Sequence, residues 1–451
     1  MMGAKYIVDN KQTIHMPRKF ESDIFCELLS NYTYGREWNV IYDSDDNCIT
    51  IGNSVKNELN GAEYVVNVTD YGVYIEGVDY PSAMRGFVTM LDKIRYDEKD
   101  EKFYIENCTE YGNPLIGFRC VHLCVFPETN IAFLKKCVRS CAIVKYSHII
   151  LEFWGMLKYD CMKELSWPFA FSKDEIKSVV REANALGVEI IPMFNHLGHA
   201  SACRELGGKH VVLDQNPKYE YLFESYGWIW NIKRADVLEL HSKIREELIE
   251  VCGEGKYFHI GCDEAYIIGN DTNKALETAK YLNDVAKELL NKGRRCIIWA
   301  DMLLSSAEIS GYEANSTLEV SNVFLNNLDK SILIADWQYS THNEIWKTSE
   351  QIKKFGFDVV CCPFENNDNI NEAINTAKKC DLFGIIHTTW NTLFVFFSGM
   401  INAGVLSYGG KTVGENDSGR FYCARVARMA MPSCGEYEKS GWAKRTTRTG
   451  V

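Results

Sequence analysis

Residues 171–201 read FSKDEIKSVVREANALGVEIIPMFNHLGHAS and have the patterns of a helix, a strand and a loop in succession. Ser172 and Glu175 have the spacing of a capping box, which predicts the start of a helix, and Gly187 is placed to end it. Apolar residues recur between these points at helical spacing and form one buried stripe: Ile176, Val179, Val180, Ala183 and Leu186. The short apolar run EIIPMF that follows has the composition of a buried strand. The stretch therefore predicts a helix that leads into a buried strand and then into a polar loop.

The same alternation covers most of the chain. Short apolar runs recur with helical patterns between them: FRCVHL (118–123), HIILEF (148–153), EIIPMF (189–194), YFHIGC (257–262), RCIIWA (295–300), SILIADW (331–337), DVVCCPF (358–364) and FGIIHTTW (383–390). Eight apolar strands that alternate with helices favour a parallel (β/α)8 barrel. A doubly wound open sheet is the alternative, but no glycine-rich phosphate loop follows any of these runs.

A smaller α/β unit precedes the barrel. AEYVVNV and YGVYIEGV alternate apolar and polar residues as half-buried strands do, and a turn at Asp70–Gly72 separates them. PSAMRGFVTMLDKI then has apolar residues at helical spacing, and a charged stretch at 96–114 follows it. We therefore expect a small α/β domain over 1–112 and a catalytic barrel with a C-terminal helical extension over 113–451.

The composition is that of a soluble globular protein. Of 451 residues, 46% are hydrophobic and 24% charged, and the net charge of −12 argues against a nucleic-acid partner. No run of about 18 apolar residues predicts a membrane span, and the start of the chain has no apolar signal region. These features predict a cytoplasmic protein whose 17 cysteines are reduced thiols. No CxxC pair occurs, and adjacent Cys361 and Cys362 chelate poorly, so no metal or other cofactor is expected.

Polar and aromatic residues follow several of the predicted strands. In a (β/α)8 barrel the carboxyl ends of the strands carry the chemistry. Trp299, Trp337 and Trp390 end three different runs and are expected to converge at the barrel mouth. One tryptophan in such a place packs in the core, but three in register favour a binding pocket. Carbohydrate fits a pocket that has aromatic walls and a few acids.

Two adjacent acids end the fourth predicted strand in HIGCDEAY (259–266). Strand alternation places His259 and Asp263 on the face that points into the barrel. Glycosidases with two independent carboxylates hold them on opposite sides of the sugar, which neighbours at one strand end cannot do. We therefore expect Glu264 alone to be the acid/base, with a pKa raised by the negative charge of Asp263.

If the nucleophile is not a protein carboxylate, it could be the substrate's own 2-acetamido oxygen, a route that some glycosidase families take. Asp263 would hold the acetamido N–H and offset the charge of the oxazolinium intermediate, and the three tryptophans would enclose the acetamido methyl. Two other interpretations remain open. The acids are a solvated strand end or helix start, or they form a Mg²⁺ site with Asp301 as third acid.

These residues resemble glycoside hydrolase family 20, the β-N-acetylhexosaminidases. AEYVVNVTDYGVYIEGVDYPSAMRGFVTML is similar to the α/β domain before the family's barrel, 171–201 to its third-strand segment, and YFHIGCDE to its signature. The resemblance implies that Asp263 orients the acetamido group and Glu264 is the general acid/base. It further assigns the acetamido pocket to Trp299, Trp337 and Trp390, and a supporting role to His199. The departures described below, together with the lack of a signal region, make the chain look closer to the intracellular hexosaminidase D-like branch.

The chain departs from the family pattern in ways that concern the sugar hydroxyls. The third-strand motif has Met193, Asn195 and Leu197 where the family carries acids and a proline. The family's hydroxyl-binding arginine is replaced by VFPET, in which Glu128 is a weak substitute, while Arg119 lies low in the barrel and is read as structural.

Other departures move roles to new residues. No tyrosine follows the seventh strand, so Tyr339 in DWQY is the candidate for the hydrogen bond to the acetamido oxygen. Glu152 is the candidate acid that supports His199. Glu365 and Asn366 are candidates for the outer hydroxyls. The aromatic segment from about 200 to 236 is expected to shape the aglycone side or to form a homodimer contact.

The sequence therefore predicts an exo-acting, retaining β-N-acetylhexosaminidase. It would release terminal β-linked GlcNAc or GalNAc from a small carbohydrate or glycan fragment by substrate-assisted catalysis, with neither nucleic acid nor membrane as a partner. Two alternatives belong to other classes, namely a non-catalytic amino-sugar-binding relative and a metal-dependent barrel hydrolase.

Overall fold

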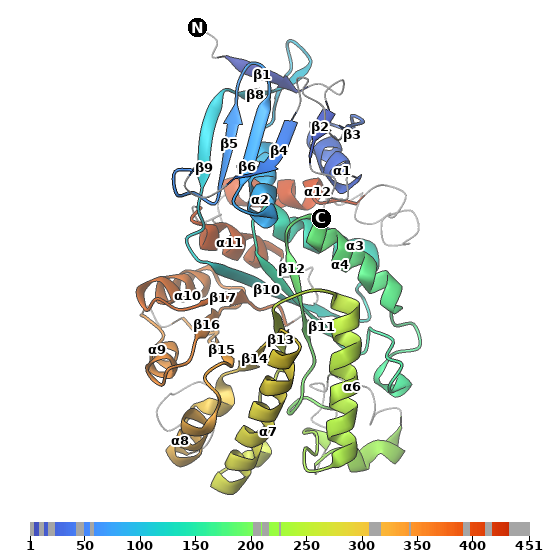
Figure 1. Ribbon diagram of the computed structural model, residues 1–451, viewed down its shortest axis with the longest axis vertical. Helices are drawn as coiled ribbons and strands as arrows, with labels where there is room; N and C mark the ends of the chain where they lie inside the picture. Colours follow the sequence, from blue (N-terminus) through green and yellow to red (C-terminus); the bar gives the residue numbers. More distant parts are fainter. Residues whose placement is uncertain are drawn as a thin grey trace.

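The computed structural model describes residues 4–8, 13–16, 23–41, 49–54, 58–201, 209, 216–224, 227–305, 317–341, 344–390, 397–410 and 417–432. A closed barrel of parallel strands forms its centre, and a smaller sheet domain lies at one end (Figure 1). The predicted (β/α)8 barrel preceded by a small α/β domain is confirmed.

The barrel strands follow one another in chain order, and the last pairs with the first. They are β10 (Phe118–Val125), β11 (His148–Phe153), β12 (Glu189–Met193), β13 (Tyr257–His259), β14 (Arg295–Trp299), β15 (Leu333–Trp337), β16 (Val359–Cys362) and β17 (Gly384–His387). Seven of the eight apolar runs contain one of these strands, and β10 extends two residues beyond its run. Most of the strands are shorter than the runs because the final residues turn into the loops at the mouth.

Alternate side chains of these strands fill the barrel interior with an apolar layer. Its members are Phe118, Cys120, Ile150, Ile191, Met193, Ile297, Trp299, Leu333, Ala335, Val360, Cys362 and Ile386. The other face of each strand packs against the surrounding helices in a separate, larger core. Trp337 and Trp390 pack onto the inner layer, so tryptophan rings lie where the apolar interior gives way to the mouth.

Helices follow the strands around the outside of the barrel. They are α3 (Ile131–Ile143), α4 (Lys173–Ala185), α6 (Ala235–Cys252), α7 (Thr272–Asn291), α8 (Leu318–Asn327), α9 (Lys347–Lys354), α10 (Asn367–Lys379), α11 (Phe397–Tyr408) and α12 (Asp417–Met429). The predicted capping box of α4 is confirmed, since Ser172 and Glu175 bond each other's backbone N–H groups. The predicted stripe of α4 is buried, and Gly187 takes a positive φ directly after it.

The N-terminal domain is built on two sheets, with strand orders β3-β2-β4-β6-β5-β9 and β1-β8-β7. Its elements are β1 (Lys5–Val8), β2 (Thr13–His15), α1 (Asp23–Tyr32), β3 (Asn39–Ile41), β4 (Ile49–Asn53), β5 (Tyr64–Val68), β6 (Val73–Gly77), α2 (Tyr80–Asp92), β7 (Arg95–Asp97), β8 (Lys102–Glu106) and β9 (Cys108–Gly112). The two predicted half-buried strands are confirmed as β5 and β6, which pair antiparallel, and the helix predicted after them is confirmed as α2. Helix α2 contacts both this sheet and barrel helix α3 (Figure 1).

The end of the described chain is tied to both parts of the molecule. Helix α12 contacts α1 of the N-terminal domain and α3 of the barrel. The Asn31 side chain donates to the carbonyls of Met429 and Met431, and Arg139 donates to that of Met431. Strand β9 ends at Gly112 and β10 begins at Phe118. The domain division at 112 stays a prediction, and these sheets lie on its two sides.

Within the described residues, no helix is long and apolar enough to cross a membrane. The cysteines of these residues are free thiols, and most are buried.

Candidate active site

The fourth barrel strand leaves the extended conformation before it reaches the acid pair. Strand β13 ends at His259, and φ is +68° at Gly261, +78° at Cys262 and +51° at Glu264. The alternation that we extended to Asp263 is therefore wrong beyond His259. Asp263 nevertheless points into the mouth, where it is 5% exposed, because the left-handed residues turn the loop inward. Non-glycine residues in this conformation cost about 1–3 kcal/mol each and gather at functional sites.

Two loops pack so closely here that their contacts admit glycine alone. A Cβ on Gly198 would lie 2.0 Å from the carbonyl oxygen of Asp263, and a Cβ on Gly261 would lie 1.9 Å from Oδ1 of Asn195. The loop after β12 and the loop after β13 are thus fixed against each other. This contact sets the position of His199, which follows Gly198 and has a φ of +57°.

Gly198→Ala is expected to inactivate a protein that still folds. The new methyl group has to displace the Asp263 backbone, and a misplacement of about 1 Å can cost about 10²-fold in rate. Hydrolysis of an aryl β-N-acetylglucosaminide measures the effect. Gly117→Ala is the matched control, because a Cβ there meets nothing within 4 Å. Equal activity of the two variants would contradict this role of the loop contact.

The structure brings His199 between the two acids. Its Nε2 atom lies 3.3 Å from Oδ2 of Asp263 and 3.3 Å from Oε2 of Glu264. Burial opposes protonation of this imidazole, but the charge of Asp263 and hydrogen bonds to both acids raise the pKa of His199 to about 9. The imidazolium thus forms the centre of the cluster at neutral pH.

The expected direction of the Glu264 pKa is wrong. Burial and the charge of Asp263 do raise it, but the hydrogen bond and charge of His199 and a hydrogen bond from Tyr266 outweigh them. The pKa of Glu264 therefore lies below its ordinary value. For Asp263, burial is likewise outweighed, by the charges of Lys209 and His199, and its pKa lies well below the usual range. In the substrate-free protein both acids are carboxylates.

A third acid, Asp301, supports the pair from below. Its Oδ2 accepts the backbone N–H of Glu264 at 2.7 Å, and its Oδ1 accepts Nε1–H of Trp337 at 3.3 Å. Burial and the charge of Asp263 raise the pKa of Asp301 well above the ordinary value. Asp301 thereby links the loop that carries Asp263 and Glu264 to the Trp337 ring. Within the described ranges these three acids do not converge on a common metal position, so the Mg²⁺ interpretation has no structural support.

The predicted tryptophans and Tyr339 form one aromatic wall beside the acids. The ring centroids of Trp299 and Trp390 are 5.5 Å apart, and Trp337 stacks on Tyr339 at 5.1 Å. Nε1–H of Trp390 donates to the Tyr339 hydroxyl, which joins the two pairs. Beneath them the His259 ring packs on Trp299 at 4.3 Å. Since Trp299 is 1% exposed, it forms the floor of the wall rather than its rim.

Sequence reasoning missed a buried lysine at this site. Nζ of Lys209 lies 2.9 Å from Oε1 of Glu152 and 3.7 Å from Oδ2 of Asp263. Glu152 was expected to support His199, but its contacts are instead Lys209, His122, Cys124 and Trp154. A lone lysine in an aromatic loop carries no pattern that marks it as part of a site.

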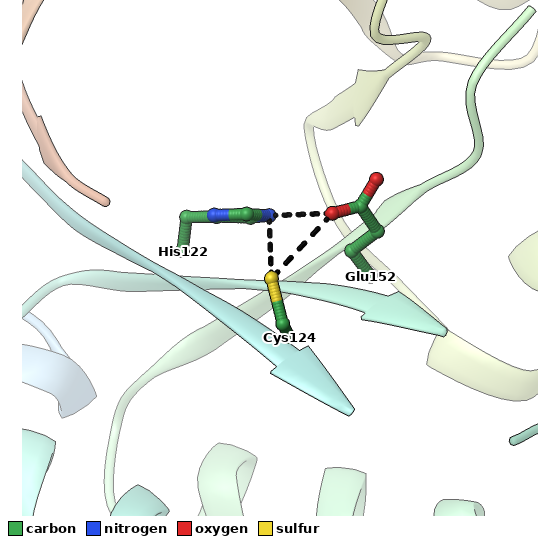
Figure 2. A group of neighbouring side chains, drawn as sticks. All are labelled: His122, Cys124 and Glu152. Carbon is green, nitrogen blue, oxygen red and sulfur yellow. Dashed lines mark hydrogen bonds and ion pairs between the residues drawn. The ribbon is translucent and has the colours of Figure 1, made fainter. Parts of the chain in front are cut away.

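Beside this lysine, His122, Cys124 and Glu152 form the one group in the described residues with metal-ligand spacing (Figure 2). The Glu152 carboxylate lies 3.1 Å from Nε2 of His122 and 3.6 Å from Sγ of Cys124. Both distances are those of hydrogen bonds. Burial and the charge of Glu152 raise the pKa of Cys124 well above its ordinary value, so the sulfur carries its proton in this arrangement and donates it to the Glu152 carboxylate. Lys209 already supplies a positive charge to the carboxylate.

Dialysis against EDTA is therefore expected to leave the hydrolysis rate unchanged, because the carboxylates of the site are bonded to N–H donors. The rate on an aryl hexosaminide before and after dialysis measures this. A loss of activity that added Zn²⁺ restores would instead establish the metal-dependent interpretation.

The remaining candidates lie outside the cluster. Arg119 donates to the carbonyls of Ile116, Gly117 and Lys145 at the opposite end of β10, so its structural role is as expected. Glu128 is exposed on the loop after β10, and Asn366 caps helix α10.

The aromatic segment from 200 to 236 divides between two roles. Trp228 donates Nε1–H to the carbonyl oxygen of Glu264, and its ring lies 4.4 Å from that of His199. Trp230 is instead fully buried against Phe223 and His241 and belongs to the core. Tyr226 lies outside the described residues. The homodimer contact stays a prediction.

Comparison with known proteins shows which relatives the chain is similar to. Lacto-N-biosidase of Bifidobacterium bifidum is 22% identical over 288 residues, which are 59% of this chain and 24% of that protein. Hexosaminidase D of Bos taurus is 23% identical over 266 residues, which are 54% of this chain and 75% of that protein. The solved structure of an exo β-N-acetylglucosaminidase from Vibrio harveyi is 14% identical to this chain, with a TM-score of 0.66. The match covers 94% of this chain and 73% of the Vibrio harveyi chain. This chain thus spans about a quarter of the first relative and three quarters of the second.

A barrel mouth that holds an acid pair against tryptophan rings is suited to cleaving glycosidic bonds. The chain belongs to glycosyl hydrolase family 20, whose catalytic-domain model matches residues 143–377, more than half of its length. The resemblance seen in the sequence is confirmed.

Proposed function

We propose that the protein is an exo-acting, retaining β-N-acetylhexosaminidase that works by substrate-assisted catalysis. The observation that carries this proposal is the state of Asp263. Both of its oxygens are occupied, Oδ1 by the Asn195 amide at 3.1 Å and Oδ2 by His199 and Lys209. A buried carboxylate held in this way is suited to orient a group and balance its charge, not to attack carbon itself. The names of the hexosaminidase D and exo β-N-acetylglucosaminidase relatives support the same substrate class.

The reaction follows in two steps. The substrate's acetamido oxygen attacks C1 while the C1–O bond to the aglycone breaks, and Glu264 gives its proton to the departing oxygen. Asp263 accepts the acetamido N–H and offsets the charge of the oxazolinium ion, whose methyl group packs between Trp299, Trp337 and Trp390. Water then attacks C1 and gives a proton to the Glu264 carboxylate. The acetamido group re-forms, and two inversions at C1 give net retention.

The proton for the first step comes from the pair of His199 and Glu264. Because the pKa of His199 is raised to about 9 and that of Glu264 is lowered, the pair holds one proton through neutral pH. The reactive form carries that proton on Glu264. We expect kcat/KM to stay flat through neutral pH and to fall as the pH passes about 9, where the pair loses its proton. A pH–rate profile measures this, and an alkaline limb that His199→Asn leaves unmoved would contradict it.

A panel of aryl glycosides tests the proposed function directly. Aryl β-GlcNAc or β-GalNAc is expected to be cleaved, aryl β-glucoside is not, and a thiazoline analogue is expected to inhibit. Equal rates on the glucoside and the acetamido sugar would overturn the mechanism. Binding of N-acetylglucosamine without hydrolysis of any member would establish the non-catalytic alternative.

We also propose a cytoplasmic location. The free cysteines of the described residues support it, since buried thiols persist in a reducing compartment. An antibody to this chain, applied to separated cytosol and medium, tests the location. Recovery of the protein from the medium would contradict the proposal.

A further inference from the structure

We propose that Lys209 is a positioning residue of the acetamido subsite, whose buried ammonium holds Asp263 in the orientation that receives the acetamido N–H. The inference rests on the proposed function for the identity of the substrate. Lys209 is then the third residue, besides His199 and Asn195, that holds Asp263 in place.

The contacts of Lys209 link four separate parts of the mouth. Its ammonium lies between Glu152 of β11 and Asp263 of the loop after β13. Its backbone N–H donates to the carbonyl oxygen of His199 at 2.9 Å. Its Nζ also lies 5.0 Å from the centre of the Trp390 ring and 5.5 Å from that of Trp154. One residue therefore fixes the relative places of the acid, the histidine and one indole of the wall.

Lys209 is buried, so its charge has to be balanced by these contacts. The residue is 3% exposed, so its charge is compensated by the protein and not by water. Burial lowers the pKa of Lys209, but the charges of Asp263 and Glu152 more than restore it, so the amine is an ammonium. Removal of one member of such a cluster leaves the others as uncompensated buried charges.

Within the described residues, titratable groups from several strands and loops surround Asp263. His199 and Lys209 are positive, while Glu264 and Glu152 are negative. Asp301 and His259 are neutral, because burial raises the pKa of Asp301 and lowers that of His259 to about 3. The Tyr339 phenol is also neutral, since burial raises its pKa. Without Lys209, burial and the charge of Glu152 act on Asp263 against His199 and the hydrogen bond from Asn195.

The variants Lys209→Met and Lys209→Arg test the inference on an aryl β-GlcNAc. Lys209→Met is expected to lower kcat by about 10²-fold with a smaller change in KM, because the acetamido oxygen is misaligned in the transition state. The acidic limb of its pH–rate profile is expected to move to higher pH by about 1–3 units. The reason is that the pKa of Asp263 rises when the carboxylate loses a neighbouring cation. Lys209→Arg keeps the charge and is expected to recover most of the rate and the original limb.

Lys136→Met is the matched control, since Lys136 is 1% exposed on helix α3 outside the mouth. It is expected to change stability and to leave the rate per folded molecule and the pH profile unchanged. In an Asp263→Asn background, Lys209→Met should lower the remaining rate by less than about tenfold, because the two residues act through one interaction. Equal losses in both backgrounds, or an unmoved acidic limb in Lys209→Met, would overturn the inference.

A second readout separates this inference from the proposed function. If wild-type protein cleaves no aryl hexosaminide, the proposed function fails, and thermal unfolding still tests the coupling of Lys209 to Asp263. Lys209→Met is then expected to lower the melting midpoint by several degrees in the wild type and by less in Asp263→Asn. An equal lowering in both would overturn the inference whatever the activity.

Discussion

Glu264→Gln is expected to lower kcat/KM for a hexosaminide with a poor leaving group by about 10²–10⁴-fold, the range for loss of a general acid. The amide has nearly the same shape as the carboxyl group, and it has no proton to give to the departing oxygen. The side chain of Glu264 is 24% exposed, which lets it reach a bound aglycone, while its backbone stays fixed by Asp301. Steady-state rates on an N-acetylglucosamine disaccharide measure the effect.

The leaving group supplies the control for this prediction. A nitrophenol departs without help, so Glu264→Gln should retain far more of its activity on the nitrophenyl glycoside than on the disaccharide. A loss of equal size on both substrates would show that Glu264 acts by holding the site together and not by giving a proton.

Asp263→Asn is the second large effect, with an expected loss of about 10²–10³-fold in kcat, as for removal of one preorganised electrostatic contact. The neutral amide no longer offsets the oxazolinium charge, and it leaves Lys209 and His199 without the carboxylate that pairs with both of them. Unlike Glu264→Gln, this variant should be slow on good and poor leaving groups alike, because cyclisation itself is impaired.

Two measurements check Asp263→Asn. Its rates on the two substrates should fall in the same proportion, and KM for the acetamido sugar should rise less than kcat falls. Full activity of the variant would remove Asp263 from the mechanism. Circular dichroism measures how much of the variant is folded. If unfolded protein accounts for the whole fall in kcat, the role of Asp263 is in stability alone.

The barrel was predictable because parallel strands covered on both faces read as short apolar runs with helices between them. Helix α4 shows how complete such a signal can be, since its cap, its buried stripe and its terminal Gly187 all appear in 16 consecutive residues and recur in the structure. The tryptophans at the strand ends were visible for the same reason, because a strand end fixes a place at the mouth.

The interior of the site was less predictable, because its charges come from distant segments. The period of a strand placed Asp263 inward, but the chain reaches that place through the left-handed Gly261 and Cys262. Because the two acids are adjacent, the sequence predicted that Asp263 raises the pKa of Glu264. The stronger, opposing effect of His199 on this pKa comes from a loop 65 positions earlier. Glu152 was identified but given the wrong partner, since nothing local marks Lys209 as its counter-ion.

The central claim is that the substrate's own acetamido oxygen attacks C1 beside Asp263. Successive fluorination of the N-acetyl methyl group tests it most directly, because each fluorine withdraws electrons from that oxygen and leaves the leaving group unchanged. The account predicts that kcat/KM on the aryl N-acyl glucosaminides falls steeply from acetyl through mono- and difluoroacetyl to trifluoroacetyl. Rates that stay level across the series would contradict it and assign the attack to a group of the protein.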